Sequence, residues 1–257
     1  MPYLIRVSSQ KGGVGKTTVA VNLSIALQCS GYQVLLIDGD TVNPSVGFHL
    51  GIEDSNTGVK ELLMGKVKLV NARVAHAPSG LHVVPGVLTQ EEYIVNNEMM
   101  QRFTAIVKNS NYDFVIVDTA PGYAVEHMGK YYNEALLVST PEMASVANIV
   151  RLTAWFDRMH LEHKLVLNKV KGKRYELHDK EIEEMYENRI TGKLPEDDIV
   201  PLSIEDHIPA YLYSRRCNFS KGIDKLAKTY YAVPGSKVPT MRRRGLLSLL
   251  FGGRRRH

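Results

Sequence analysis

A glycine-rich segment near the start of the chain holds the residues whose chemistry is easiest to recognise. It lies between an apolar run and a helical pattern and reads Lys11-Gly12-Gly13-Val14-Gly15-Lys16-Thr17-Thr18. Glycines let backbone N–H groups approach an anion closely, and the first turn of a helix adds positive potential. A lysine here can reach the outer phosphates of a nucleotide, and a threonine hydroxyl can face a magnesium ion. The segment therefore predicts a site for a nucleoside triphosphate and Mg²⁺; a glycine turn without a ligand is the alternative.

Three aspartates end or follow apolar runs of the kind that form buried parallel strands. Asp38 and Asp40 follow the run 33–37, and Asp118 ends the run 112–118. Carboxylates at the carboxyl ends of parallel strands face the ligand crevice of a doubly wound sheet. We therefore expect Asp118 to hold the magnesium through water. Asp38 and Asp40 are candidates for binding the magnesium ion or positioning the water around it. Asp-Gly-Asp is also a common turn, so a polar strand exit is the alternative for these two.

The front of the glycine-rich segment departs from the general phosphate-loop pattern, because Gln10 stands where that pattern has a glycine. The string from Lys11 to Thr18 resembles the deviant phosphate loop of the ParA/MinD family of dimerising ATPases. The resemblance implies that Lys11 reaches across a dimer to the partner's nucleotide, as an arginine finger does in other NTPases. It also implies nucleotide contacts from Gly12, Gly13, Val14, Gly15, Lys16, Thr17 and Thr18.

The same resemblance implies roles for polar positions further along the chain. It implies that Asp40 orients the attacking water and that Asp38 lies in the outer shell of the metal. Relatives bind adenine with an asparagine at a strand end, here Asn168, and pack the ring against a proline, here Pro201, in an expected last strand at 198–201. The implied catalytic residues are Lys11, Lys16 and Asp40, and the implied metal residues are Thr17, Asp38 and Asp118.

These side chains need a scaffold in which strands alternate with helices. The apolar runs that we predict as strands recur between helical patterns, at residues 3–7, 33–37, 81–85, 112–118, 135–139 and 164–167. Such alternation is typical of a parallel sheet with helices on both faces. We predict an α/β fold with a doubly wound, mostly parallel sheet. The expected organisation is an ATPase domain over residues 1–231, a linker at 232–241 and a basic amphipathic tail at 242–257.

The cysteine count and the hydropathy pattern exclude several classes of protein. Cys29 and Cys217 are the only cysteines and lie far apart in the sequence. This argues against a disulfide framework and against the clustered cysteines of iron–sulfur proteins. No apolar run approaches the ~18 residues that span a bilayer, and no signal peptide precedes the first strand. We therefore expect a cytoplasmic protein.

The positive charge of the chain is concentrated at its end. The net charge is +5, and residues 235–257 hold seven basic and no acidic residues, which leaves 25 basic against 27 acidic residues elsewhere. Between two arginine clusters lie the apolar side chains Leu246, Leu247, Leu249, Leu250 and Phe251. On a helix these cover a wide arc with Ser248 opposite. The segment resembles the membrane-targeting end of MinD proteins; a helix packed on its own body or on a partner is the alternative.

Together the resemblance implies an ATPase that binds ATP and Mg²⁺, forms an ATP-dependent homodimer and attaches reversibly to the inner face of the cell membrane. Such a protein positions a partner or cargo protein, for example at a division site. The alternative is a ParA-type segregation ATPase that binds DNA; Gln10 and the arginine-rich tail favour it, and the net charge of −2 on the rest of the chain opposes it. A nucleotide-sensing adaptor without appreciable turnover is a third hypothesis.

Overall fold

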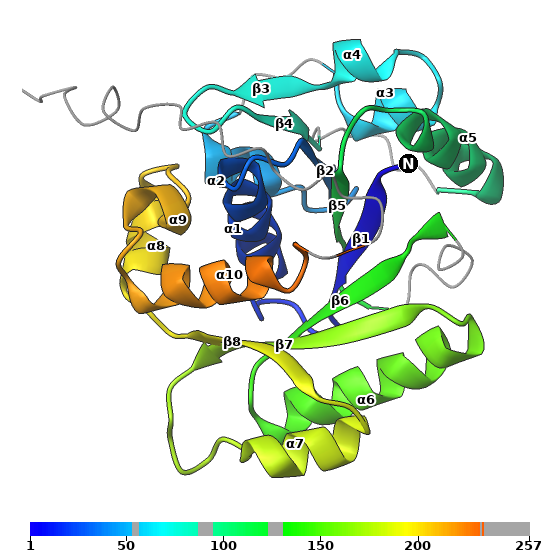
Figure 1. The fold of residues 1–257 in the computed structure, drawn as a ribbon. Coiled ribbons are helices and arrows are strands. Elements are labelled where there is room, and N and C mark those ends of the chain that lie inside the picture. Colours follow the sequence, from blue (N-terminus) through cyan, green and yellow to red (C-terminus); the bar gives the residue numbers. More distant parts are fainter. Residues whose placement is uncertain (53–56, 87–94, 123–130, 232, 234–257) are drawn as a thin grey trace, which may run out of the picture.

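The fold is built on one eight-stranded sheet (Figure 1). The computed structural model describes residues 1–52, 57–86, 95–122, 131–231 and 233. The strand order is β3-β4-β2-β5-β1-β6-β7-β8, and every neighbouring pair is parallel except the antiparallel pair β3–β4. The strands are β1 Tyr3–Ser8, β2 Val34–Gly39, β3 Val74–His76, β4 Leu81–Val84, β5 Phe114–Thr119, β6 Glu134–Ser139, β7 Glu162–Val170 and β8 Ile190–Pro195. The predicted mostly parallel sheet is confirmed.

Helices cover both faces of this sheet (Figure 1). Helices α1, α8, α9 and α10 lie on one side, and α3, α5, α6 and α7 lie on the other. The helices are α1 Lys16–Cys29, α2 Val46–Leu50, α3 Val59–Leu63, α4 Leu69–Ala72, α5 Asn97–Lys108, α6 Met143–Arg158, α7 Asp179–Tyr186, α8 Ile199–Glu205, α9 Ala210–Tyr213 and α10 Asn218–Lys228. The arrangement is doubly wound, as predicted.

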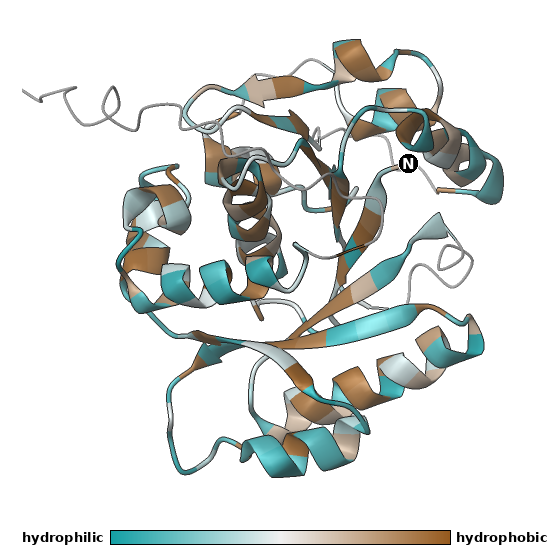
Figure 2. Cartoon of the chain, viewed as in Figure 1, coloured by the Kyte–Doolittle hydropathy of each residue, from teal (hydrophilic) through white to brown (hydrophobic). Residues whose placement is uncertain are grey.

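The central strands are mostly apolar and are buried along almost their whole length, because both of their faces are covered. Figure 2 colours the central strands and α1 mostly as hydrophobic, whereas the outer helices α5, α6, α7 and α10 carry many hydrophilic positions. β5 and β6 are buried at every position. After β1 the chain builds the β2 side of the sheet, and it later returns to build β6, β7 and β8 on the other side of β1. The carboxyl end of β1 therefore lies where the strand order reverses, which is the usual ligand position in such sheets.

The last strand differs from the prediction. Residues 198–201 are not a strand, because α8 begins at Ile199 and Pro201 lies in its first turn. A proline is tolerated there because its missing N–H would have no partner within the helix. The edge strand β8 precedes it, and only Leu194 in it is buried. An edge strand tolerates Gly192 and Pro195, so its sequence lacks the apolar run of a buried strand.

The end of the sheet opposite the glycine-rich segment is held together by a buried carboxylate. Glu134 is 0% exposed and begins β6. It accepts hydrogen bonds from the hydroxyls of Tyr230 at 2.6 Å and Tyr3 at 3.1 Å, and Lys164 Nζ lies 2.6 Å from its Oε2 atom. This cluster ties the end of the domain, just after α10, to β1 and β7. In the part of the chain that the structure describes, no helix is long and apolar enough to cross a membrane.

The predicted linker and tail fall almost entirely outside the described residues. Of residues 232–257, the structure describes Val233 alone. Leu246, Leu247, Leu249, Leu250 and Phe251, predicted to contact membrane, therefore lie outside the described residues, and the domain boundaries at 231 and 241 stay predictions.

Candidate functional site

The glycine-rich segment forms a loop between β1 and α1. Gly13 and Gly15 have positive φ values of 78° and 90°, and Gly15 is the N-cap of α1. A Cβ atom on Gly15 would lie 2.3 Å from Asn168 Nδ2, whereas a Cβ on Gly12 would meet nothing within 4 Å. Glycine is therefore required at position 15 by backbone conformation and by space. The loop leads directly into the N-terminus of a helix, an arrangement that suits an anion.

Thr17 and Asp118 join the first turn of α1 to the end of β5. The Thr17 hydroxyl donates to Asp118 Oδ2 at 2.5 Å and lies 3.0 Å from the Ser45 hydroxyl. Asp118 is 1% exposed, and its other oxygen, Oδ1, has no hydrogen-bond partner. A buried carboxylate oxygen without a partner is unfavourable unless a ligand completes it. Hydroxyl and carboxylate oxygens are the ligands that Mg²⁺ prefers, so Thr17 and Asp118 fit a magnesium site.

The electrostatics of this pair also favour a cation. Burial raises the pKa of Asp118 to about 6 against the opposing charge of Lys16 and the hydrogen bond from Thr17, with a smaller upward contribution from the charge of Asp40. Lys16 is itself 9% exposed. A bound divalent cation would favour the charged form of the carboxylate. Lys16 and Asp118 lie close enough to influence each other electrostatically, as a phosphate and metal site requires.

Asp38 lies beside Asp118 on the neighbouring strand, where the two residues are register partners. Its Oδ2 atom accepts the backbone N–H groups of Ser45 and Val46, both at 2.9 Å, and its Oδ1 atom accepts the N–H of Asp40 at 3.3 Å. Burial and the charge of Asp118 raise the pKa of Asp38 to about 7. Both oxygens bond to backbone, so Asp38 fixes the start of α2. Its place in the outer shell of the metal stays a prediction.

Asp40 holds the loop that follows β2. Its Oδ1 atom accepts the N–H groups of Asn43 at 2.9 Å and Val42 at 3.2 Å, and the residue is 8% exposed. This is the side-chain-to-backbone turn that aspartate favours. Its backbone N–H donates to Asp38, the register partner of Asp118, so Asp40 lies near the proposed metal position. The prediction that it orients water is untested by these contacts.

Lys11 lies at the exposed mouth of the loop. Its carbonyl accepts the Ser9 hydroxyl at 2.9 Å, and the Ser9 carbonyl accepts the N–H of Gly122 at 3.0 Å. The turn after β5 therefore touches the start of the loop. An exposed lysine in this position can reach a second molecule, but its role across a dimer stays a prediction.

The two predicted adenine residues are placed differently. Asn168 is 4% exposed and its Nδ2 atom donates to the Val14 carbonyl at 2.8 Å, so one of its two N–H donors is held by the loop. Pro201 lies exposed on α8, a helix that packs against α2 and α9. The adenine contacts of both residues stay predictions.

Two residues of the site were missed from the sequence. Ser45 meets Thr17 through its hydroxyl, and the Lys169 ammonium donates to the Gly13 carbonyl at 2.8 Å. Ser45 follows Asn43 and Pro44 in a loop, a position that by itself gives no sign of a nucleotide contact. Lys169 had no sequence signal beyond its position after Asn168.

Comparison with known proteins identifies the family. Residues 1–202 match the family model described as ParA: NUBPL iron-transfer P-loop NTPase. The chain belongs to the ParA family of P-loop NTPases. The predicted ParA/MinD relationship is confirmed.

Relatives of this ParA-family chain include ATP-binding and cell-division proteins. An uncharacterized ATP-binding protein from Methanocaldococcus jannaschii is 29% identical over 235 residues, which cover 90% of this chain and 89% of the relative. The septum site-determining protein MinD from Pyrococcus horikoshii, solved with Mg-ADP, has a TM-score of 0.79 and 24% identity over 89% of this chain and 96% of that one. A MinC:MinD cell division protein complex from Aquifex aeolicus has a TM-score of 0.79 and 25% identity, with 88% and 95% of the chains covered.

Two acidic residues, Glu176 and Glu196, bond the turn that follows β7. Lys171 pairs with Glu196 at 3.2 Å, and the Glu176 carboxylate accepts the backbone N–H groups of Lys171, Gly172 and Lys173 at 2.8, 2.7 and 3.3 Å. The anion position in this turn is therefore filled by the protein itself. Of the cationic side chains in this turn, Lys171 therefore already has an acidic partner.

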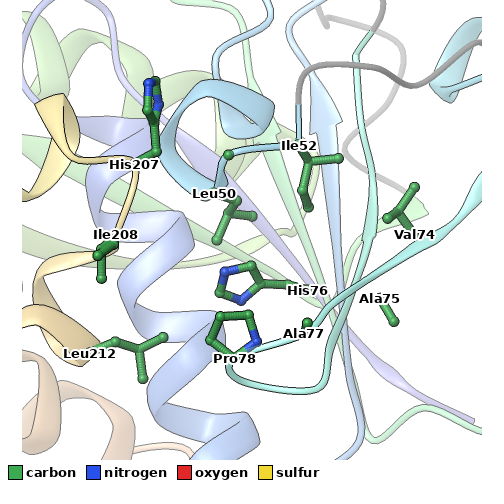
Figure 3. A pocket seen from close by; sticks show the side chains of 11 residues that line it. Leu50, Ile52, Val74, Ala75, His76, Ala77, Pro78, His207, Ile208 and Leu212 are labelled. Carbon is green, nitrogen blue, oxygen red and sulfur yellow. The ribbon is translucent and has the colours of Figure 1, made fainter. Parts of the chain in front are cut away.

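A separate apolar pocket lies beside α2 rather than at the phosphate loop (Figure 3). Its volume is about 580 Å³. Figure 3 shows Leu50 and Ile52 on one side, His76 and Pro78 from the β3–β4 hairpin below, and the α8–α9 connection closing it, including Ile208. Its lining lacks the loop glycines, Lys16 and the aspartates, so the nucleotide chemistry does not belong to it.

Proposed function

We propose that this ParA-family chain is a MinD-type ATPase that binds ATP and Mg²⁺, pairs with a second copy and hydrolyses ATP. The observation that carries the proposal is the bond between Thr17 and Asp118, with the unpartnered Asp118 Oδ1 atom beside it. Thr17 follows the buried Lys16 in the first turn of α1, directly after the phosphate loop. The match to the ParA family and the ATP-binding relative support the same nucleotide.

Each residue of the loop has a defined task in this proposal. The backbone N–H groups of the glycine-rich loop bind the phosphates, and Lys16 neutralises charge on the outer phosphates. Mg²⁺, held by Thr17 and Asp118, would supply further neutralisation of the phosphate oxygens. Asp40 orients the water for attack on the terminal phosphorus, and Lys11 of each copy reaches the nucleotide of the other.

Asp38 supports a link between the nucleotide and the surface of the domain. It bonds the N–H groups of Ser45 and Val46, and Ser45 in turn meets the Thr17 hydroxyl. A change at the metal position therefore bears directly on the start of α2. We propose that this connection makes dimerisation depend on ATP.

The tail makes membrane binding depend on dimerisation. Full burial of its five apolar side chains is worth at most about 7–15 kcal/mol, and ordering a dozen residues costs ~1–2 kcal/mol each. One tail therefore binds marginally, even with ~1 kcal/mol from each arginine near anionic lipid. Two tails on one dimer gain roughly 10²–10⁴ in avidity. We propose that ATP recruits the dimer to the inner face of the cell membrane, where it positions an unidentified partner or cargo protein, and that hydrolysis releases it.

Co-sedimentation with anionic vesicles tests this proposal. The full chain should sediment with ATP and remain in solution with ADP. Lys16→Ala should not respond to ATP, and Leu249→Glu with Leu250→Glu should bind nucleotide without sedimenting. Equal sedimentation of Lys16→Ala and wild type would disprove the nucleotide coupling, and scattering that finds a monomer with a non-hydrolysable ATP analogue would disprove the dimer.

A DNA-binding segregation ATPase is the second candidate, supported by the arginine-rich tail. The net charge of −2 on residues 1–234 argues against it, because unspecific DNA binding needs free positive charge on the domain. Filter binding across a salt series separates the candidates. Tight, salt-sensitive DNA binding by residues 1–231 alone would favour the DNA-binding function.

A further inference from the structure

Strand β7 is irregular where it passes the phosphate loop. Its pairing with β8 shifts register between Leu167 and Val170, and Lys169 within this interval has a φ of 56°. In a regular strand consecutive side chains point to opposite faces of the sheet. A bulge re-aims side chains, and bulges are frequent beside active sites. Here the bulge lets two consecutive side chains, Asn168 and Lys169, reach the same loop.

These two side chains hold two consecutive carbonyl groups of the loop. Lys169 Nζ donates to the Gly13 carbonyl and Asn168 Nδ2 donates to the Val14 carbonyl, both at 2.8 Å. The fit is close, because a Cβ on Gly15 would meet Asn168 Nδ2 at 2.3 Å. The end of β7 therefore forms hydrogen bonds with two successive peptide groups of the loop.

A hydrogen bond that fixes a carbonyl group also fixes the direction of the N–H group in the same peptide unit. In a trans peptide the C=O of one residue and the N–H of the following residue point in opposite directions across one plane. The two carbonyl bonds therefore aim the N–H groups of Val14 and Gly15 away from β7. Glycines at 13 and 15 would otherwise allow these planes to rotate freely. The nest of N–H groups is thus oriented before any phosphate arrives.

We propose that Lys169 is a positioning residue for the phosphate site. Together with Asn168 it orients the N–H groups of Val14 and Gly15 toward the phosphates of a nucleoside di- or triphosphate. The proposal rests on the nucleotide function proposed above. Lys169 acts through the loop and need not touch the nucleotide. The left-handed backbone conformation at position 169 is unfavourable for lysine and favourable for glycine. Replacing Lys169 with glycine therefore relieves backbone strain while it removes the hydrogen bond to the loop, and the two effects can be measured separately.

The test replaces Lys169 with glycine and measures two quantities. Without nucleotide, Lys169→Gly should melt at the same temperature as wild type or higher, because glycine relieves the strained conformation. Its affinity for ADP with Mg²⁺, measured by calorimetry, should fall about three- to tenfold, the usual effect of losing one such hydrogen bond. Lys169→Arg, which keeps a cationic donor, should recover most of the affinity.

Lys173→Gly is the matched control. It removes one lysine and adds one glycine four residues further on, at an exposed position whose N–H bonds Glu176. It should leave ADP affinity unchanged and should not raise the melting temperature. A merely structural role for Lys169 would instead lower the melting temperature of Lys169→Gly.

Measuring ADP affinity at high salt distinguishes a positioning role of Lys169 from simple attraction between its charge and the nucleotide. At 0.5 M NaCl the screening length falls to about 4 Å, so a loss of affinity caused only by charge should disappear. The proposal requires the loss in Lys169→Gly to persist at that salt concentration. It is overturned if the loss disappears, or if Lys169→Gly binds ADP as tightly as wild type. Failure of the wild type to bind ADP would disprove the nucleotide function itself.

Discussion

Asp38 and Asp118 lie side by side as register partners on β2 and β5, and burial raises the pKa of both carboxyls. Only Asp118 keeps an oxygen without a hydrogen-bond partner, whereas Asp38 uses both oxygens on backbone N–H groups. The two acids therefore have different roles. Asp118 has an oxygen available to a cation, whereas Asp38 holds the segment that leads into α2.

The raised pKa values make the domain sensitive to pH when no cation is present. Between the ordinary value of 3.8 and values of about 6 and 7, the folded state binds more protons than the unfolded state. The contribution of these carboxyls to the free energy of unfolding therefore decreases as pH rises through this interval. In Mg²⁺-free, nucleotide-free buffer, Asp118→Asn should melt several degrees above wild type at pH 7.5, for a gain on the order of 2 kcal/mol.

At pH 5 the advantage of Asp118→Asn should shrink, because the wild-type carboxyl is then mostly protonated. The same variant should lose the Mg²⁺-dependent part of its ADP affinity. Melting curves over this pH range provide the check, and a lower melting temperature for the variant at pH 7.5 would contradict the assignment.

Thr17 should be needed for the metal rather than for the fold. Thr17→Ala removes the hydroxyl that bonds Asp118 and meets Ser45. ADP affinity in Mg²⁺ should fall by roughly 10–100-fold, a typical loss when a group that orients a metal ligand is removed. Thr17→Ser keeps the hydroxyl and should bind nearly as wild type. If Thr17→Ala loses as much ADP affinity in EDTA as it does in Mg²⁺, the hydroxyl has no role at the metal.

The glycines of the loop should differ in their tolerance of alanine. Gly15→Ala introduces a Cβ 2.3 Å from Asn168 Nδ2 at a φ of 90°. We expect a loss of stability of about 2–4 kcal/mol. Gly12→Ala meets open space and should change stability by less than about 0.5 kcal/mol. Urea unfolding of the two variants measures the difference, and equal stability would show that the loop adapts.

Asp40 should be needed for turnover more than for binding. Asp40→Asn keeps a carbonyl oxygen that can accept from Val42 and Asn43, but it loses the carboxylate charge. Phosphate release in the presence of vesicles should fall by about 10²–10⁴-fold while ATP affinity stays within a few fold. Asp40→Ala should show the same loss of turnover and also a looser loop. Full activity in Asp40→Asn would assign the water to another residue.

The polar cluster at the opposite end of the sheet should affect stability alone. Glu134→Ala leaves Lys164 and the hydroxyls of Tyr3 and Tyr230 without their acceptor. A loss of about 3–5 kcal/mol is expected when one partner of a buried pair is removed. ADP affinity measured below the melting temperature should not change. An altered affinity would mean that the two ends of the sheet are coupled.

Local features of the sequence were enough to place the phosphate loop and the main strands. The glycine conformations at 13 and 15, the apolar runs of β1, β2 and β5, and the acids that end two of them all depend on neighbouring residues or on burial of a whole strand. The segregation of charge into residues 235–257 is likewise a property of composition. For these reasons the fold class, the family and the position of the loop could be predicted.

Only the tertiary structure decided how segments far apart in the chain meet. The bond between Thr17 and Asp118 spans 101 residues, and the bonds from Asn168 and Lys169 to the loop span 154 and 156. Strand register and the bulge in β7 set these contacts, and a weakly apolar edge strand such as β8 gives no periodic signal. Pairing geometry between distant strands is a cooperative property of the packed sheet, so no local pattern of residues encodes it.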